Sequence, residues 1–549
     1  MASTSAPSLA SAAPMALPNT IRVSVASENI VPATPRIRSP GRRMPSAGEP
    51  ASTVMTSNWK PRSHACAPVG PRLKRQPGCA PCGDQATGRT AGSAAWSAGH
   101  PKPVRNRNVR PRHRLDRWAR ARRKVGWEFM RPDYTTAGAL PTALGLLAKR
   151  RRISDIGPVR FISALTTKAD WLAAVEDLRR QLRGLAAADL VALFVHPQFL
   201  PDAESVAAAV RRMTGAKHLV GCTGAGILGC GREVEGAPAI AVLAGELPGV
   251  AITATHLTDE ELAEARGAGY WHFQLAVEPQ ANPAFLLLAD PFSISVTDLV
   301  RELGEAYPGA PVVGGLASGA QEPGGHRLFL DGEIFAAGAV CVGLTGRIAV
   351  RAVVAPGCRP IGQPLTITRA AKNIIFEMGG QPPWVVLQEL LPTLPARDQQ
   401  LARTALLLGR VANEYQEEFH RGDFLVRNLL GHDPQSGAMA VGDVVRTGQT
   451  VQFQVRDGQM ADQDLQALLA AQRNGLARQP ARGAVVFSCL GRGQGMFGEA
   501  GHEVRTIERE LGPLPLAGFF GNGEIGPVGD RPFVHGFTSV IGLFCEPAA

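Results

Sequence analysis

A thiol and a guanidinium stand close together in the segment 487–493, which reads Phe-Ser-Cys-Leu-Gly-Arg-Gly. A neighbouring arginine lowers the pKa of a thiol, and its planar guanidinium can bind a carboxylate through two parallel hydrogen bonds. Because glycines flank the arginine, we expect Cys489 to face a cavity in which Arg492 holds an anionic group. The alternative is that Cys489 is a small buried apolar residue and that Arg492 is an ion-pair partner.

A second polar group lies in the segments 521–527 and 535–539. The peptide N–H groups of the glycine turn at 523 can converge on an anion while the carboxylate of Glu524 takes an amine, although a turn with a capping carboxylate is the alternative. His535 can bind a ligand or haem iron, but a lone histidine is more often satisfied within the protein. The combined prediction is one site for an amino-acid-like ligand, formed by Cys489, Arg492, Gly493, Gly523, Glu524, His535 and Thr538.

Alanine in place of Arg492 or Glu524 is expected to weaken ligand binding. A loss of about 1.5–3 kcal/mol is the range for a hydrogen bond to a charged group. Little change in the stability of the fold is expected from either replacement.

Three stretches of the chain repeat one pattern, and they supply the elements that must position these residues. Each stretch has an apolar strand-like run, an amphipathic helix pattern (203–214, 296–307 and 500–511) and a second apolar run that ends in glycines. The intervals are 27 positions from Phe194 to Gly221, 26 from Leu288 to Gly314 and 31 from Phe487 to Gly518. A strand, a helix and a strand at this length form a βαβ unit. Ligands bind at the carboxyl ends of the strands in such sheets.

The pattern predicts an α/β fold of repeated βαβ units with added antiparallel hairpins, in which helices cover mixed sheets. We expect two tightly associated domains, at 159–388 and 389–549, because a composition shift in the loop-rich stretch 392–403 indicates a boundary near 385–395. Further helices are expected at 169–182, 368–378 and 462–473, and strands at 239–243, 250–254, 424–427 and 451–455. Asp331-Gly332 predicts a turn, and the runs 339–344 and 348–353 are expected to pair with each other.

The basic character of the chain belongs to one end. The 549 residues carry a net charge of +11, but residues 1–152 hold 27 Lys and Arg against 6 Asp and Glu. The remainder is acidic, with a net charge of −10, so binding to nucleic acid is expected at most through the N-terminal segment. Residues 1–158 lack apolar periodicity, which predicts disorder. A basic tail, a transit peptide and an over-extended reading frame, with translation starting at Met130 or near Val159, are the alternatives.

The cysteines show no spacing typical of a disulfide framework, and Cys79-Ala80-Pro81-Cys82 is only half of a zinc-site pattern. No metal site is expected. No apolar run is long enough to cross a bilayer, and the sequence begins with no clear signal peptide. The sequence therefore predicts a cytoplasmic protein without a membrane partner.

Five motifs resemble the paired FIST domains of F-box and intracellular signal transduction proteins. Their residues are 357–362 with Thr366, Thr368 and Asn373, then 424–427, 487–493, 521–527 and 535–539. The resemblance extends over roughly 159–544. It implies a sensory protein that binds a small, amino-acid-like ligand and signals to a separate partner, such as a histidine kinase or a cyclase encoded nearby.

Other functions remain open at this point. Some bacterial FIST proteins are similar modules that bind haem and respond to nitric oxide, so haem is left open as a cofactor, with His196 and His218 as further candidate ligands. A protein-recruitment scaffold is a third alternative. Cys489, His535 and Glu524 also have the residue types of a cysteine hydrolase, but no protease signature surrounds the cysteine, and no enzyme activity is expected.

Overall fold

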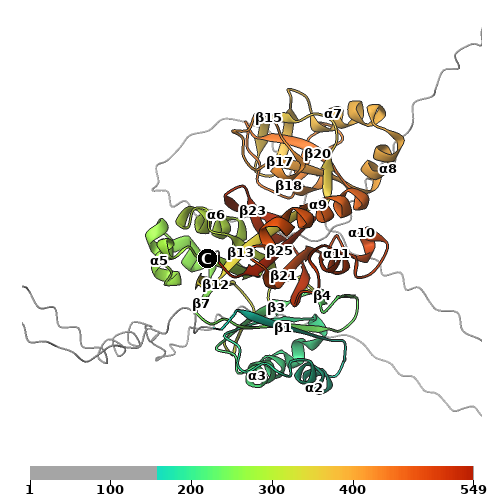
Figure 1. The fold of residues 1–549 in the computed structure, drawn as a ribbon. Coiled ribbons are helices and arrows are strands. Elements are labelled where there is room, and N and C mark those ends of the chain that lie inside the picture. Colours follow the sequence, from blue (N-terminus) through green and yellow to red (C-terminus); the bar gives the residue numbers. More distant parts are fainter. Residues whose placement is uncertain (1–156, 548–549) are drawn as a thin grey trace, which may run out of the picture. The chain divides into compact units, whose positions relative to one another are not determined.

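The computed structural model describes residues 157–547, and the expectation for residues 1–158 lies almost entirely outside this range. The described chain forms three six-stranded sheets and a seven-stranded one. Helices cover these mixed sheets (Figure 1), so the expected α/β class is confirmed. None of the described helices is long and apolar enough to cross a membrane.

The first sheet has the strand order β1-β6-β2-β3-β10-β11, and β2 and β3 are its parallel pair. Helices α2 and α3 cover its outer face (Figure 1). The strands are β1 (Arg160–Thr166), β2 (Leu190–Val195), β3 (His218–Thr223), β6 (Ile240–Glu246), β10 (Leu328–Leu330) and β11 (Glu333–Phe335). The helical elements are α2 (Trp171–Gln181), η3 (Pro197–Asp202) and α3 (Ala203–Thr214).

The second sheet has the same plan, with the order β24-β23-β9-β8-β12-β7 and the parallel pair β8 and β9. Its strands are β7 (Val250–Leu257), β8 (Ala284–Ala289), β9 (Val312–Leu316), β12 (Ala339–Gly346), β23 (Glu524–Val528) and β24 (Arg531–His535). Its helical elements are α4 (Asp259–Glu264), α5 (Ala268–Leu275), η4 (Pro279–Ala281) and α6 (Val296–Ala306).

The third sheet repeats the plan again, with the order β13-β25-β21-β22-β4-β5 and the parallel pair β21 and β22. Its strands are β4 (Gly226–Gly229), β5 (Arg232–Glu235), β13 (Ala349–Pro356), β21 (Ala481–Cys489), β22 (Leu516–Gly521) and β25 (Thr538–Cys545). Its helices are α9 (Gly458–Leu476), α10 (Gln494–Phe497) and α11 (His502–Leu511). The three predicted βαβ units are therefore confirmed.

The three units exchange hairpins in a cycle. The β4–β5 hairpin of the first unit pairs with β22 of the third, the β10–β11 hairpin of the second pairs with β3 of the first, and the β23–β24 hairpin of the third pairs with β9 of the second. One apolar core joins the three sheets and contains Phe194, Leu288 and Phe487, one from each first parallel strand. No unit completes its sheet without a neighbour.

A glycine stands at the same register position of each second parallel strand. Gly221, Gly314 and Gly518 lie opposite Leu193, Leu287 and Val486. A Cβ atom at these glycines would stand 1.9, 1.9 and 1.8 Å from the carbonyl oxygen of the opposite residue. The conserved geometry of the three units thus explains why the repeat in the sequence ends on glycine.

A closed barrel is inserted in the third unit between β13 and α9. Strands β15, β16, β19, β18, β17 and β20 pair in this order, and β20 pairs with β17 to close the ring. Its elements are β14 (Cys358–Pro360), β15 (Leu365–Ala371), β16 (Ile374–Met378), α7 (Pro383–Leu390), η5 (Leu391–Thr393), α8 (Ala396–Ala405), β17 (Leu406–Val411), η6 (Arg421–Asp423), β18 (Phe424–His432), β19 (Met439–Val441) and β20 (Thr450–Arg456). The expected domain boundary at 388/389 falls in α7, and the two-domain division stays a prediction.

Two local predictions are wrong. The expected helix 368–378 is the β15–β16 hairpin, whose turn places Lys372 at φ +54°. The β-branched residues of this segment favour a pleated strand, and a Thr start and a Gly stop do not outweigh them. The runs near 339–344 and 348–353 do not pair with each other, because β12 pairs with β7 and β8 whereas β13 pairs with β25. The Asp331-Gly332 turn is confirmed.

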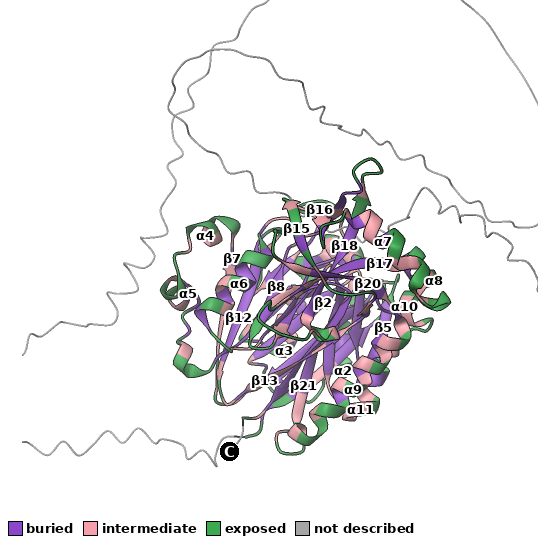
Figure 2. Cartoon of the chain, turned by 90° about the horizontal axis from the view of Figure 1, so that it is seen from above, coloured by how far each residue is buried: buried purple, intermediate pink, exposed green. Residues whose placement is uncertain are grey.

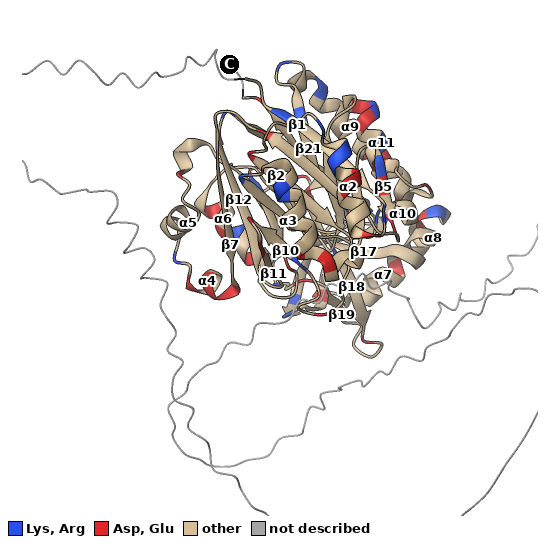
Figure 3. Cartoon of the chain, turned by 90° about the horizontal axis from the view of Figure 1, so that it is seen from below, with Lys and Arg blue, Asp and Glu red and all other residues tan. Residues whose placement is uncertain are grey.

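Burial and charge follow this layering. The strands are largely buried, whereas helices such as α8 and α9 have exposed faces (Figure 2). Charged residues gather on the helices and loops, for example at the acidic α4, and the strands consist mostly of uncharged residues (Figure 3). Fully buried charged residues are therefore exceptions. Arg492 and Glu524 belong to the predicted site, whereas Asp290 and Asp457 are buried elsewhere.

Candidate functional site

Arg492 is buried and paired within the protein. It follows β21, and its Nε and Nη2 atoms lie 2.8 and 2.7 Å from Oε1 of Glu503. Its Nη1 donates to the carbonyl of Phe537 at 3.4 Å, and its guanidinium lies 5.4 Å from the centre of the Phe497 ring. The ion-pair interpretation of Arg492 describes this arrangement, so a ligand carboxylate would have to replace Glu503.

Glu503 is the partner that the sequence did not reveal. It lies in the first turn of α11, where the helix dipole favours a carboxylate, and it is fully buried. Its second oxygen accepts a hydrogen bond from the hydroxyl of Ser488, the residue before Cys489. The segment 487–493 is thereby fastened to α11 by one serine and one arginine.

A second carboxylate reaches this place from the first unit. Glu233 of β5 accepts a hydrogen bond from the amide of Val504 at 2.9 Å. Burial, and next the charge of Glu503, raise the pKa of Glu233 to about 7. Glu235 of the same strand accepts from the amide of Gln494 at 2.8 Å. Neither residue was predicted, because the exchanged hairpin lies far away in the sequence.

Gly493 is favoured here by its backbone conformation. It has a φ of +63°, which side-chain-bearing residues rarely adopt. A Cβ atom there would also stand 2.6 Å from the carboxylate oxygens of Glu235, but this exposed side chain can move away.

Glu524 and His535 form a second group. They are opposite each other in the β23–β24 hairpin, and both are buried. Glu524 accepts from the amide of Thr538 at 3.2 Å, and the Thr538 hydroxyl donates to the carbonyl of Gly536 at 3.1 Å. Gly523 accepts from the amide of Leu316 at 2.9 Å through its carbonyl. This group therefore also holds the exchanged hairpin in place.

The turn between β24 and β25 joins the two groups. The carbonyl of Phe537 accepts from Arg492, and the next amide, that of Thr538, donates to Glu524. Phe537 lies in the left-handed region at φ +60°, which is unusual for an aromatic residue. Strain of this kind persists where the surroundings fix the backbone. The structure thus brings the predicted residues together through this turn.

Cys489 lies beside the turn. It is buried, and its sulfur accepts from the amide of Gly491 at 3.5 Å. It belongs to a small apolar cluster with Cys358, Leu407, Val426 and Phe537, through which the barrel packs on the third unit. The seven predicted residues contact other residues of the protein, and their role in ligand binding stays a prediction.

The other candidates have partners elsewhere. His535 Nε2 lies 3.0 Å from the carbonyl of Gly526, His218 lies 2.9 Å from Asp331, and His196 accepts from the amide of Gln198. Arg427, a buried arginine of β18 that is not one of the seven predicted site residues, pairs with Asp443 at 3.1 Å. Residues 157–547 contain no cluster of three or more His, Cys, Asp or Glu arranged to hold a metal ion.

A surface cavity of about 340 Å³ lies between the ends of β1 and β21, away from the site.

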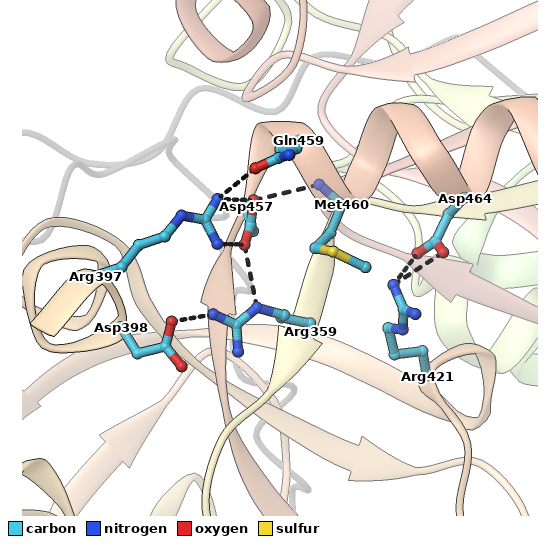
Figure 4. A network of polar contacts seen from close by, with 8 residues as sticks. All are labelled: Arg359, Arg397, Asp398, Arg421, Asp457, Gln459, Met460 and Asp464. Carbon is cyan, nitrogen blue, oxygen red and sulfur yellow. Dashed lines mark hydrogen bonds and ion pairs between the residues drawn. The ribbon is translucent and has the colours of Figure 1, made fainter. Parts of the chain in front are cut away.

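A separate ion-pair network fastens the barrel to α9 (Figure 4). The carboxylate of Asp457 caps this helix by accepting a hydrogen bond from the amide of Met460. The same carboxylate accepts from Arg359 at 3.1 Å and from Arg397 at 2.7 and 2.8 Å. Arg421 binds Asp464 at 2.9 Å, further along the helix. Arg359 is therefore a structural residue at this junction.

The stability of the protein is expected to fall in mild acid because of His535. Burial lowers the pKa of this imidazole to about 4, whereas its unfolded value is near 6.5. The contribution of neutral His535 is thus complete above about pH 6.5 and is lost as the pH falls toward 4, with a total on the order of 3 kcal/mol. Urea unfolding between pH 4.5 and 7 measures it. The same acid sensitivity in His535→Gln would contradict this assignment.

The comparisons with known proteins agree with the motifs. The FIST N domain matches residues 189–381 and the FIST C domain matches 384–527. An uncharacterized protein of Mycobacterium tuberculosis H37Rv is 39% identical over 374 residues, which cover 68% of this chain and 95% of the relative. One from Mycobacterium bovis is 38% identical over 390 residues, covering 70% and 98%.

Among solved structures, the cyanuric acid hydrolase of A. caulinodans aligns over 70% of this chain and 99% of its own, with a TM-score of 0.25 and 11% identity. FIST domains are generally regarded as signalling domains that sense small ligands. With its paired N and C domains in sequence, the chain belongs to the FIST family.

Proposed function

We propose that this protein is a cytoplasmic sensor that binds a small amino-acid-like ligand beside the 535–538 turn and passes the signal to a separate signalling protein. One observation carries the proposal. A buried arginine and a buried carboxylate, Arg492 and Glu524, bind this one strained turn, and a second buried carboxylate, Glu503, pairs with Arg492. Charged groups are rarely buried without a functional or structural demand, and these residues join the second and third sheets.

The ligand acts by replacing Glu503 as the ion-pair partner of Arg492. Its carboxylate replaces Glu503 on Arg492, and its ammonium group lies near Glu524. Breaking a buried ion pair costs about 3–5 kcal/mol, so the ligand must bind the opened arrangement more tightly by at least that amount. Because Arg492 also holds the carbonyl of Phe537, this exchange moves the turn and the Cys489 cluster against which the barrel packs. The barrel then transmits the change.

The partner is expected to be an enzyme of signal transduction, such as a histidine kinase or a cyclase. The support is the family relationship alone. The cytoplasmic location is supported by the spacing of the cysteines in the sequence, which is not that of a disulfide framework. Haem stays the alternative ligand, because His196, His218 and His535 each have one ring nitrogen in a hydrogen bond, as metal-ligating histidines also do.

A screen of the twenty L-amino acids at millimolar concentration tests the ligand class. At least one is expected to raise the thermal midpoint, because binding to the folded state stabilises it by mass action. Arg492→Lys keeps the charge and loses the planar fork, so calorimetry is expected to show at least tenfold weaker binding. The exposed Arg301→Lys, which changes the same groups on α6, is the control and should bind as the wild type does.

Two results would count against the proposal. A midpoint that none of the twenty compounds moves would rule out an amino acid at this site. Equal affinities of the Arg492→Lys and Arg301→Lys variants for a ligand that does bind would place the ligand elsewhere.

A further inference from the structure

We propose that Glu233 is a proton-operated latch that fastens the exchanged β4–β5 hairpin of the first unit to helix α11 of the third. The inference goes beyond ligand sensing and does not rest on it. It concerns a carboxylate that the proposed site does not use, at the one place where this hairpin meets α10 and α11.

The geometry isolates one oxygen of Glu233. Its Oε1 accepts the amide of Val504 at 2.9 Å, in the first turn of a ten-residue helix. Its Oε2 is buried and has no hydrogen-bond partner among residues 157–547, and the side chain is 8% exposed. A buried anionic oxygen without a donor is costly, whereas a protonated one carries no charge.

The charges around Glu233 are nearly all negative. Glu503 of α11 lies near Glu233 itself, and Glu508 of the same helix lies beside Gly231 at the turn of the hairpin. Glu235 lies two residues away from Glu233 on β5. The cation of this cluster, Arg492, binds Glu503 through two nitrogens, so it neutralises that carboxylate rather than Glu233. Arg232 lies at the turn end of the hairpin and is exposed. Burial, and next the charge of Glu503, raise the pKa of Glu233, although the backbone amides of Val504 and Glu503 act in the opposite direction.

Loss of the proton releases the hairpin. Arg492 balances the charge of Glu503, so the ionised Glu233 adds one uncompensated buried charge at the first turn of α11, and the helix dipole offsets only about half of it. The hairpin also covers the segment beside Arg492, since Glu235 accepts from Gln494 and lies against Gly493. Its release therefore opens the approach to the buried arginine as the pH rises through neutrality.

Hydrogen exchange of the full chain at pH 6.0 and pH 8.5, corrected for the intrinsic rates, tests the latch. In the wild type, the protection of segments 226–235 and 502–506 is expected to fall at least tenfold at the higher pH, relative to α3. In Glu233→Gln, which is neutral at both values, protection is expected to stay constant. Glu333→Gln is the matched control, because this exposed glutamate lies on the corresponding β10–β11 hairpin and should leave the response intact.

Protection in the wild type that does not depend on pH would overturn the proposal, and so would an unchanged response in Glu233→Gln. Should that variant fail to fold, the wild type still decides the question. Its unfolding at pH 6 is expected to release roughly one proton from Glu233, since the unfolded carboxylate is ionised there, in addition to any uptake by histidines. A proton balance explained by the histidines alone would contradict the latch.

Discussion

Gly518→Ala is expected to destabilise the protein by more than about 4 kcal/mol or to prevent folding. The new Cβ atom would stand 1.8 Å from the carbonyl oxygen of Val486 and 2.7 Å from its carbonyl carbon. These are backbone atoms of β21, the central parallel strand of the third sheet, so no side chain can rotate away. The strands must separate, and the core between Phe487 and Phe519 is lost with them.

Denaturant unfolding of Gly518→Ala and Gly269→Ala measures this effect. Gly269 lies in α5 with nothing within 4 Å of a new Cβ atom, and its φ is not positive. Alanine there is expected to be neutral or to stabilise by about 0.4–1 kcal/mol, because it restricts the unfolded chain. The equivalent positions Gly221 and Gly314 should behave as Gly518 does. A loss below about 1 kcal/mol at all three would show that the register of the three units is not as described.

The repeated units were predictable because their signal is local. An apolar run, an amphipathic helix and a glycine-ended run occur within about thirty residues, and the glycine follows from the close approach of two parallel strands. The same local logic failed at 368–378, where a helix-like start and stop enclose a β-hairpin. There the pairing with β19 and β20 of the barrel decides the structure.

The exchange of hairpins was not predictable in this way. Ile227 pairs with Phe519, and Glu524 pairs with Gly315, so the partners are more than 200 residues apart. The apolar periodicity of one segment does not indicate which distant segment pairs with it in the sheet. A sequence analysis therefore finds the strands without finding the order in which the three sheets share them.

The candidate site shows the same limit. Arg492 and Glu524 were recognised from residue types beside glycines, and they do lie at one turn. Glu503 had a usable signal, a carboxylate in the first turn of a predicted helix eleven residues after the arginine. Glu233 had none, because it reaches α11 only through the exchanged hairpin.

Arg492→Met is expected to destabilise the fold by about 3–5 kcal/mol, the cost of leaving a buried charge without its partner. Glu503 would keep the hydroxyl of Ser488 as a donor but would lose both nitrogens of the guanidinium. This expectation replaces the one made for alanine from the sequence alone, in which the stability changed little. The difference arises because the arginine is buried and not at the wall of an open cavity.

The double variant Arg492→Met, Glu503→Met separates stability from recognition. Replacing a whole buried ion pair by apolar residues of similar volume is often neutral or stabilising, so urea unfolding of the double variant is expected to return to within about 1 kcal/mol of the wild type. Arg301→Met, at an exposed pair with Glu305, is the control and should change the stability by less than about 0.5 kcal/mol.

A double variant as unstable as the single one would mean that Arg492 stabilises the fold mainly through the Phe537 carbonyl and the Phe497 ring. The expected recovery has a consequence for function. A protein that would be equally stable with two methionines keeps its buried arginine and glutamate at a cost in desolvation, and such a pair is useful where one partner is exchanged for a ligand. Restored stability together with lost ligand binding would therefore tie the ion pair to sensing rather than to folding.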